Sequence, residues 1–216
     1  MVIKGVVFDM DGLMFDTEIL TYKLQKPILA KRGIDYPVEW YLQTVGKRSE
    51  DIVLMFKKLC GDSFDYEEFR VQCREAYQKY TDEFGVPIKK GLFELLDYLK
   101  KKGIKIALCT STTERSARRT LRISGTLPYF DELVCGDDVQ RGKPHPDPFL
   151  KAAEKLGMEP EDCLALEDSL NGIKSAYSAG MTAVMIPDLI EPTDEIRPMC
   201  YKILPSLNDV IKIFDE

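Results

Sequence analysis

The sequence predicts an α/β fold in which a parallel β-sheet carries helices on both faces. Two observations predict it. From about residue 92 to residue 204, short apolar runs alternate with segments of helical periodicity, which is typical of a parallel sheet with crossover helices. One strand precedes this region, and a helical pattern from about Thr17 to Phe84 separates the two. We therefore expect a three-layer α/β/α core into which a small helical domain is inserted.

The first strand is predicted at Val2 to Phe8, a short apolar run of the length of a buried strand. The helices that follow are clearest over residues 66–84, where apolar residues recur at three- and four-residue spacing. We expect the core to comprise residues 1–15 and 85–216, and the helical domain, as a cap, residues 16–84.

After Gly85-Val86-Pro87 the pattern changes to alternating strands and helices. Predicted strands are 104–109, 132–135, 163–166, 182–186 and 202–204. Predicted helices are 92–101, a helix from Glu114, 147–156 and 172–179. This order is that of a Rossmann-like sheet.

Composition excludes several classes of protein. Of the 216 residues, 44% are hydrophobic and 31% charged, as in an ordinary soluble domain. A net charge of −6 argues against a nucleic-acid-binding surface, and no apolar run could span a bilayer. The six cysteines form no C-x-x-C pair, which argues against structural zinc. We expect a cytoplasmic monomer with no nucleic-acid or membrane partner.

Polar residues follow the ends of four predicted strands. Because the carboxyl ends of parallel strands share one edge of the sheet, where ligands bind, we expect these side chains to converge. The residues are Asp9 and Asp11, Thr110 and Ser111, Lys143, and Glu167 and Asp168.

The carboxylates in this set suit phosphoryl transfer. Asp9 can attack phosphorus and form an aspartyl-phosphate, and Asp11 can protonate the leaving oxygen and later deprotonate water. Asp9, Asp11, Glu167 and Asp168 are the candidate ligands of Mg²⁺, a hard ion that takes oxygen ligands. Asp168 and Asp9 would hold the ion, and Glu167 would either bind it through water or orient one of its ligands.

The remaining groups would neutralise and grip the phosphate. Lys143 offsets the negative charge of Asp9 and of the phosphoryl group. Thr110 and Ser111, with backbone N–H groups at the next helix N-terminus, can bind phosphate oxygens.

Each group alone has a simpler explanation. Asp9 and Asp11 could belong to an exposed turn. They could also suggest a calcium-binding loop, but an EF-hand loop would need a glycine where Met14 stands, so that alternative fails. Thr110 could be a helix N-cap, and Glu167 and Asp168 ordinary acids in a first helical turn. The combination, rather than any one residue, favours catalysis.

The set Asp9-Met10-Asp11-Gly12, Thr110, Lys143-Pro144 and Glu167-Asp168 resembles the four motifs of the haloacid dehalogenase-like superfamily. Asp16-Thr17-Glu18 and the segment from Lys143 to Phe149 are similar to the subgroup containing β-phosphoglucomutase and sugar-phosphate phosphatases. The resemblance implies an aspartyl-phosphate intermediate, Mg²⁺, a cap that closes over the substrate, and a small phosphorylated metabolite as substrate.

Departures from this subgroup favour a phosphatase. Thr21 stands where the mutases carry a histidine, and Lys47 and Arg48 place an arginine about one position from the mutase arginine. β-Phosphoglucomutase stays open as the alternative. A metal-free dehalogenase would not need Asp11 or the Glu167-Asp168 pair, and a receiver-type signalling module would lack the inserted helices. Candidate substrate contacts in the cap are Thr17, Glu18, Lys47 and Arg48. Lys47 and Arg48 could equally be a solvated helix start, and Glu18 could be an ordinary acid of a first helical turn.

Overall fold

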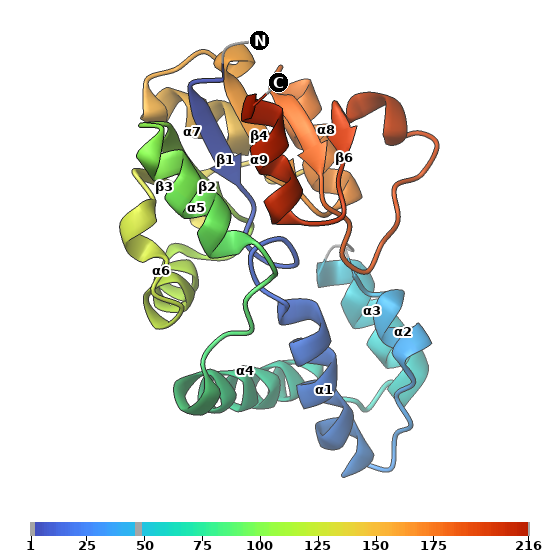
Figure 1. Ribbon diagram of the computed structural model, residues 1–216. Coiled ribbons are helices and arrows are strands. Elements are labelled where there is room, and N and C mark those ends of the chain that lie inside the picture. Colours follow the sequence, from blue (N-terminus) through green and yellow to red (C-terminus); the bar gives the residue numbers. More distant parts are fainter. Residues whose placement is uncertain (1–2, 46–48, 216) are drawn as a thin grey trace. The chain divides into compact units, whose positions relative to one another are not determined.

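The computed structural model describes residues 3–45 and 49–215 (Figure 1). Its core is a six-stranded parallel sheet in the order β3-β2-β1-β4-β5-β6. The predicted α/β fold with a parallel sheet is therefore confirmed. The strands are β1 (Gly5–Phe8), β2 (Lys105–Cys109), β3 (Glu132–Val134), β4 (Cys163–Glu167), β5 (Thr182–Met185) and β6 (Lys202–Ile203).

Helices cover both faces of this sheet. The α-helices are α5 (Leu92–Lys101), α6 (Glu114–Ile123), α7 (Asp147–Leu156), α8 (Leu170–Ser178) and α9 (Leu207–Asp215). Short 3₁₀ turns are η1 (Leu127–Tyr129), η2 (Gly136–Asp138), η3 (Pro160–Asp162) and η4 (Arg197–Met199). Figure 1 shows α5 and α9 in front of the sheet and α7 behind it.

Helix α9 is missing from the sequence prediction, which ends with the last strand. Its signal is present in the sequence: Leu207, Val210 and Ile213 recur every three residues and are all buried. The stripe covers only about two turns, so it is easily overlooked in a short terminal segment. Helix α8 also begins two residues earlier than expected, because Ser169 caps it by accepting a hydrogen bond from the N–H of Gly172.

Strand β1 lies at the centre of the sheet and is buried on both faces. Val7 belongs to a cluster with Phe149 of α7 and Ile173 of α8. Phe8 points to the opposite face, where its ring meets that of Phe130 edge-on at 6.1 Å. Burial on both sides explains why this strand is a continuous apolar run instead of an alternating one.

Between β1 and α5 the described residues form four further helices: α1 (Thr17–Ala30), α2 (Val38–Leu42), α3 (Ser49–Cys60) and α4 (Tyr66–Phe84). By its contacts the chain divides into two compact units. Met1–Asp16 and Ile88–Glu216 form the sheet-containing core unit, and Thr17–Pro87 form a helical unit.

The helical unit has an aromatic core of its own. The ring of Phe56 lies 5.1 Å from that of Phe69 and 5.7 Å from that of Tyr36, and all three side chains are buried. The predicted apolar face of α4 is buried at Phe69 but not at its end, where Phe84 is 66% exposed. No helix among the described residues is long and apolar enough to cross a bilayer.

Candidate active site

The candidate site lies where the strand order of the core unit reverses. From β1 the chain continues to β2 and β3 on one side, whereas β4 pairs with β1 on the other. Ligands of open parallel sheets bind outside the carboxyl ends of the strands at such a switch point. Asp9 directly follows β1, and its backbone N–H donates to the carbonyl of Leu166 in β4. Glu167 and Asp168 lie at the end of β4, so three carboxylates meet at this point.

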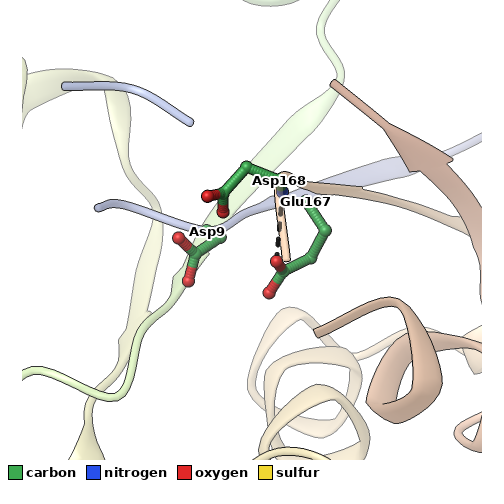
Figure 2. Close-up of side chains that lie close together, drawn as sticks. All are labelled: Asp9, Glu167 and Asp168. Carbon is green, nitrogen blue, oxygen red and sulfur yellow. Dashed lines mark hydrogen bonds between the residues drawn. The ribbon is translucent and has the colours of Figure 1, made fainter. Parts of the chain in front are cut away.

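Figure 2 shows the side chains of Asp9, Glu167 and Asp168 beside one another at the ends of these two strands. One carboxylate oxygen from each lies within 4.8 Å of the other two. Asp9 is 8% exposed and Glu167 fully buried. Three carboxylates this close and this buried repel one another unless cations offset their charge.

Lys143 supplies one of these cations. Its ammonium donates to Asp9 Oδ1 at 2.6 Å, to Glu167 Oε1 at 2.5 Å and to the carbonyl of Cys109 at 2.8 Å. The Lys143 side chain is only 6% exposed, and its ammonium lies 5.0 Å from the centre of the Phe149 ring. All three N–H donors are thus engaged, so Lys143 acts as a fixed positive charge between the nucleophile candidate and Glu167.

Glu167 is held from its other side as well. Its Oε2 accepts hydrogen bonds from Ser169 Oγ at 3.0 Å and from the backbone N–H groups of Asp168 and Ser169 at 3.2 Å. A β-carbon added to Gly172 of α8 would lie 1.9 Å from Glu167 Cδ. Only glycine at this position lets the helix approach the carboxylate so closely.

Gly12 has a similar role beside Asp168. Its φ of +86° is a left-handed conformation that glycine adopts without strain. A β-carbon there would lie 2.2 Å from Asp168 Oδ2. The glycine after the two aspartates is thus required both by the backbone and by the space that Asp168 occupies.

The pKa values of the clustered carboxyl groups are raised, because these groups are buried and have too little positive charge around them. The pKa of Asp9 is raised to about 8, chiefly by burial; the charge of Lys143 acts to lower it, and the negative charges of Glu167 and Asp11 act to raise it. Burial also raises the pKa of Asp168 well above its ordinary value, and Asp9 and Glu167 add to the effect. Burial lowers the pKa of Lys143, but the two neighbouring carboxylates outweigh it and hold the ammonium charged.

These residues fit a hard divalent cation. The donor atoms are all carboxylate oxygens, as Mg²⁺ prefers, and the three carboxylates outnumber the one lysine, which pairs with Asp9 and Glu167. A divalent ion would bring these four groups to neutrality. Asp9, Glu167 and Asp168 are the residues that could hold it or its bound waters.

Asp11 is outside this group of three carboxylates. Its Oδ2 accepts a hydrogen bond from Thr112 Oγ1 at 2.8 Å, which ties the segment after β1 to the segment after β2. Three of the four predicted metal ligands thus cluster, and the assignment of Asp11 as a fourth stays a prediction.

Thr110 and Ser111 follow β2 as expected, but neither caps α6. Thr110 is buried, and its Oγ1 accepts the backbone N–H of Thr112 at 3.1 Å; the N-cap position belongs to Thr113. Ser111 is exposed. The N-cap explanation of Thr110 is therefore wrong, and its role as a phosphate ligand stays a prediction.

The remaining predicted contacts belong to the helical unit or fall outside the described residues. Thr17 and Glu18 open α1; Thr17 is buried, and Glu18 Oε2 accepts a short hydrogen bond from Tyr41 Oη. Lys47 and Arg48 lie outside the described residues.

Sequence reasoning missed several residues beside this site, among them Gly172 and Asp188. Gly172 carries no chemical signal, because its importance lies in the side chain it lacks. Asp188, three residues after β5, has a buried side chain paired with Lys89. It could have been found by the rule that identified the others, since it too follows the end of a parallel strand.

Comparison with known proteins agrees with this geometry. The profile of the haloacid dehalogenase-like hydrolase family matches residues 6–186. A phosphorylated carbohydrates phosphatase of Thermotoga maritima is 31% identical over 206 residues, 95% of this chain and 88% of that protein. A phosphoglycolate phosphatase of Nitrosospira multiformis is 32% identical and covers 99% of this chain and 96% of its own. The structure of CbbY from Rhodobacter sphaeroides in complex with phosphate superposes with a TM-score of 0.80 at 27% identity, covering 97% of this chain and 96% of that one. This chain belongs to the haloacid dehalogenase-like hydrolase family, the family that its four sequence motifs resemble.

Proposed function

We propose that this hydrolase is a Mg²⁺-dependent phosphatase that cleaves small phosphorylated carbohydrates through an aspartyl-phosphate on Asp9. The observation that carries the proposal is the group of Asp9, Glu167 and Asp168, whose oxygens lie within 4.8 Å of one another beside buried Lys143. The phosphatase of Thermotoga maritima, named for phosphorylated carbohydrates and similar over 95% of this chain, supports the substrate class.

The first half of the reaction transfers the phosphoryl group to the protein. A carboxylate oxygen of Asp9 attacks phosphorus, and the bond from phosphorus to the sugar oxygen breaks. Asp11 gives its proton to that oxygen, so the sugar leaves as an alcohol. The hydrogen bond from Thr112 holds Oδ2 of Asp11 and so orients the carboxyl group to which we assign this proton transfer.

The second half hydrolyses the aspartyl-phosphate. Asp11, now a carboxylate, takes a proton from water, and the water oxygen attacks phosphorus. The bond between phosphorus and the Asp9 oxygen breaks, which releases inorganic phosphate and restores both carboxyl groups to their starting forms. Asp11 thus acts as acid in one step and as base in the next.

The surrounding groups keep Asp9 ionised and hold the phosphate. Bound Mg²⁺ would supply positive charge to Asp9 and to the phosphoryl oxygens, which would otherwise repel each other. Lys143 holds Asp9 Oδ1 at 2.6 Å and contributes the second positive charge. Thr110 accepts the N–H of Thr112, so its own hydroxyl hydrogen can be donated to a phosphate oxygen.

The helical unit would act as the cap and select the sugar. Thr17, Glu18, Lys47 and Arg48 are the residues that we assign to this recognition. Alanine variants should change KM for one sugar phosphate more than for another, whereas changes in the core unit should lower kcat for all substrates.

The test is incubation with β-glucose-1-phosphate, Mg²⁺ and trace glucose-1,6-bisphosphate, with free phosphate and glucose-6-phosphate measured together. The proposal expects free phosphate, none in EDTA, and a wider panel of sugar phosphates then ranks substrates. Stoichiometric glucose-6-phosphate without free phosphate would instead establish β-phosphoglucomutase activity.

The matched variant is Asp9→Asn, which keeps the shape of the side chain and removes the nucleophile. It should abolish turnover while circular dichroism and the unfolding transition show an intact fold. Substantial residual kcat in this variant would refute the aspartyl-phosphate pathway, whichever product the wild-type protein forms.

A further inference from the structure

One buried acid next to the site has no part in the reaction described above. The side chain of Asp188 is 7% exposed, and its Oδ1 accepts a short hydrogen bond from Lys89 Nζ. Its other oxygen, Oδ2, is buried without a hydrogen-bond partner among the described residues. Buried carboxylate oxygens are normally paired, so this one indicates that a donor is needed here.

Oδ2 of Asp188 faces the same space as Asp168. Both oxygens lie close to Gly12. A β-carbon added to Gly12 would lie 2.2 Å from Asp168 Oδ2 and 3.4 Å from Asp188 Oδ2. The negative charge of Asp188 also contributes to the raised pKa of Asp168. The orphaned oxygen therefore borders the space next to a candidate metal ligand.

Lys89 is placed to orient Asp188. The backbone N–H of Lys89 donates to the carbonyl of Met14 at 2.9 Å, and the neighbouring Ile88 forms a bridge with Phe15. Lys89 is thus anchored to the turn that follows Asp11 and Gly12. By holding Oδ1 it fixes the orientation of the Asp188 carboxylate, and its ammonium offsets part of that negative charge.

We propose that Asp188 is a positioning residue for Mg²⁺, whose Oδ2 accepts a hydrogen bond from a water molecule bound to the ion. Mg²⁺ commonly keeps several of its waters when protein carboxylates bind it, and groups that accept from such ligands fix the geometry of the site. The inference rests on the proposed function, since it assumes a Mg²⁺ ion at Asp9 and Asp168.

The experiment is calorimetric titration of the full chain with MgCl₂ for the wild type, Asp188→Asn and Lys89→Met. In Asp188→Asn the amide oxygen stays with Lys89, so the NH₂ group faces the water and cannot accept its hydrogen bond. We expect Mg²⁺ to bind about 10- to 100-fold more weakly, the usual effect of removing such a contact. Lys89→Met keeps the acceptor and removes only the group that orients it, so Mg²⁺ affinity should fall less than in Asp188→Asn.

The double variant Asp188→Ala with Lys89→Met removes the ion pair as a unit and serves where Asp188→Asn does not fold. It should show the same loss of Mg²⁺ affinity. Unchanged affinity in the Asp188 variants, with Asp168→Ala losing affinity, would overturn the inference and leave the proposed function standing. Equal weakening by Lys89→Met would also overturn it, because the pair would then act only by holding the turn. No Mg²⁺ binding by the wild type would overturn both proposals.

Discussion

Gly172→Ala is the sharpest test of how the site is packed. The added methyl group would lie 1.9 Å from Glu167 Cδ and 2.0 and 2.1 Å from its two oxygens. Both elements are fixed: α8 begins at the Ser169 cap, and Glu167 ends a strand paired on both sides. The Glu167 side chain must therefore leave its place.

The magnitude follows from two opposing contributions. Alanine is favoured over glycine inside a helix by about 1 kcal/mol. Displacing Glu167 separates it from Lys143, 2.5 Å away, and both groups are almost fully buried. Breaking a buried pair costs about 3–5 kcal/mol, and the lower value applies because Lys143 keeps Asp9 as a partner. The net loss of folding free energy should be about 2 kcal/mol.

Urea unfolding at neutral pH measures this loss, and Gly142→Ala is the matched control, because a β-carbon there meets nothing within 4 Å. In a Glu167→Ala background the same Gly172→Ala change should be neutral or stabilise by up to about 1 kcal/mol. A penalty of equal size in both backgrounds would refute the contact with Glu167 as its cause.

Two further predictions concern Asp131 and Thr112. Burial tends to raise the pKa of Asp131, but the N–H of Ile106, at 2.8 Å, and two lysines outweigh it and lower that pKa. Because the folded pKa lies below the unfolded one, this stabilisation is present above pH 4 and is lost as the pH falls. Asp131→Asn should cost about 0.5–1 kcal/mol in urea unfolding at pH 7 and progressively less below pH 4, and a penalty independent of pH would contradict this. Thr112→Val removes the hydrogen bond to Asp11 without changing size; steady-state kinetics should show kcat reduced about tenfold with an unchanged fold, and an unaltered kcat would exclude Thr112 from orienting the acid.

The sheet was predictable because its signal is local. Strands β1, β2 and β4 are short, mostly apolar runs with a polar residue at or directly after their end, and β1 shows this pattern most clearly because it is buried on both faces. Knowing only that parallel strands end at one edge was enough to expect Asp9, Lys143, Glu167 and Asp168 together. The structure brings these four together through direct contacts or close approach.

The features of the site that could not be predicted are contacts between residues, most of which lie far apart in the sequence. The sequence does not show how the side chains of Asp9 and Asp11 are oriented; the hydrogen bond from Thr112, which follows another strand, fixes Oδ2 of Asp11. Gly172 resembles any helical glycine until the carboxylate beneath it is known. Lys89 and Asp188 are far apart in the chain, and each alone is an ordinary charged residue.

The position of β1 in the sheet also constrains the order in which the protein can fold during synthesis. Gly5 pairs with Lys105 on one side and with Cys163 on the other. Strand β1 therefore cannot form its hydrogen bonds to both neighbours until β4 has been synthesised. Residues 17–87 make their contacts within one continuous segment, and such local contacts form fast. On the ribosome the helical unit can therefore be complete while β1, an entirely apolar strand, is still unpaired. This is the stage at which the nascent chain is most exposed to aggregation.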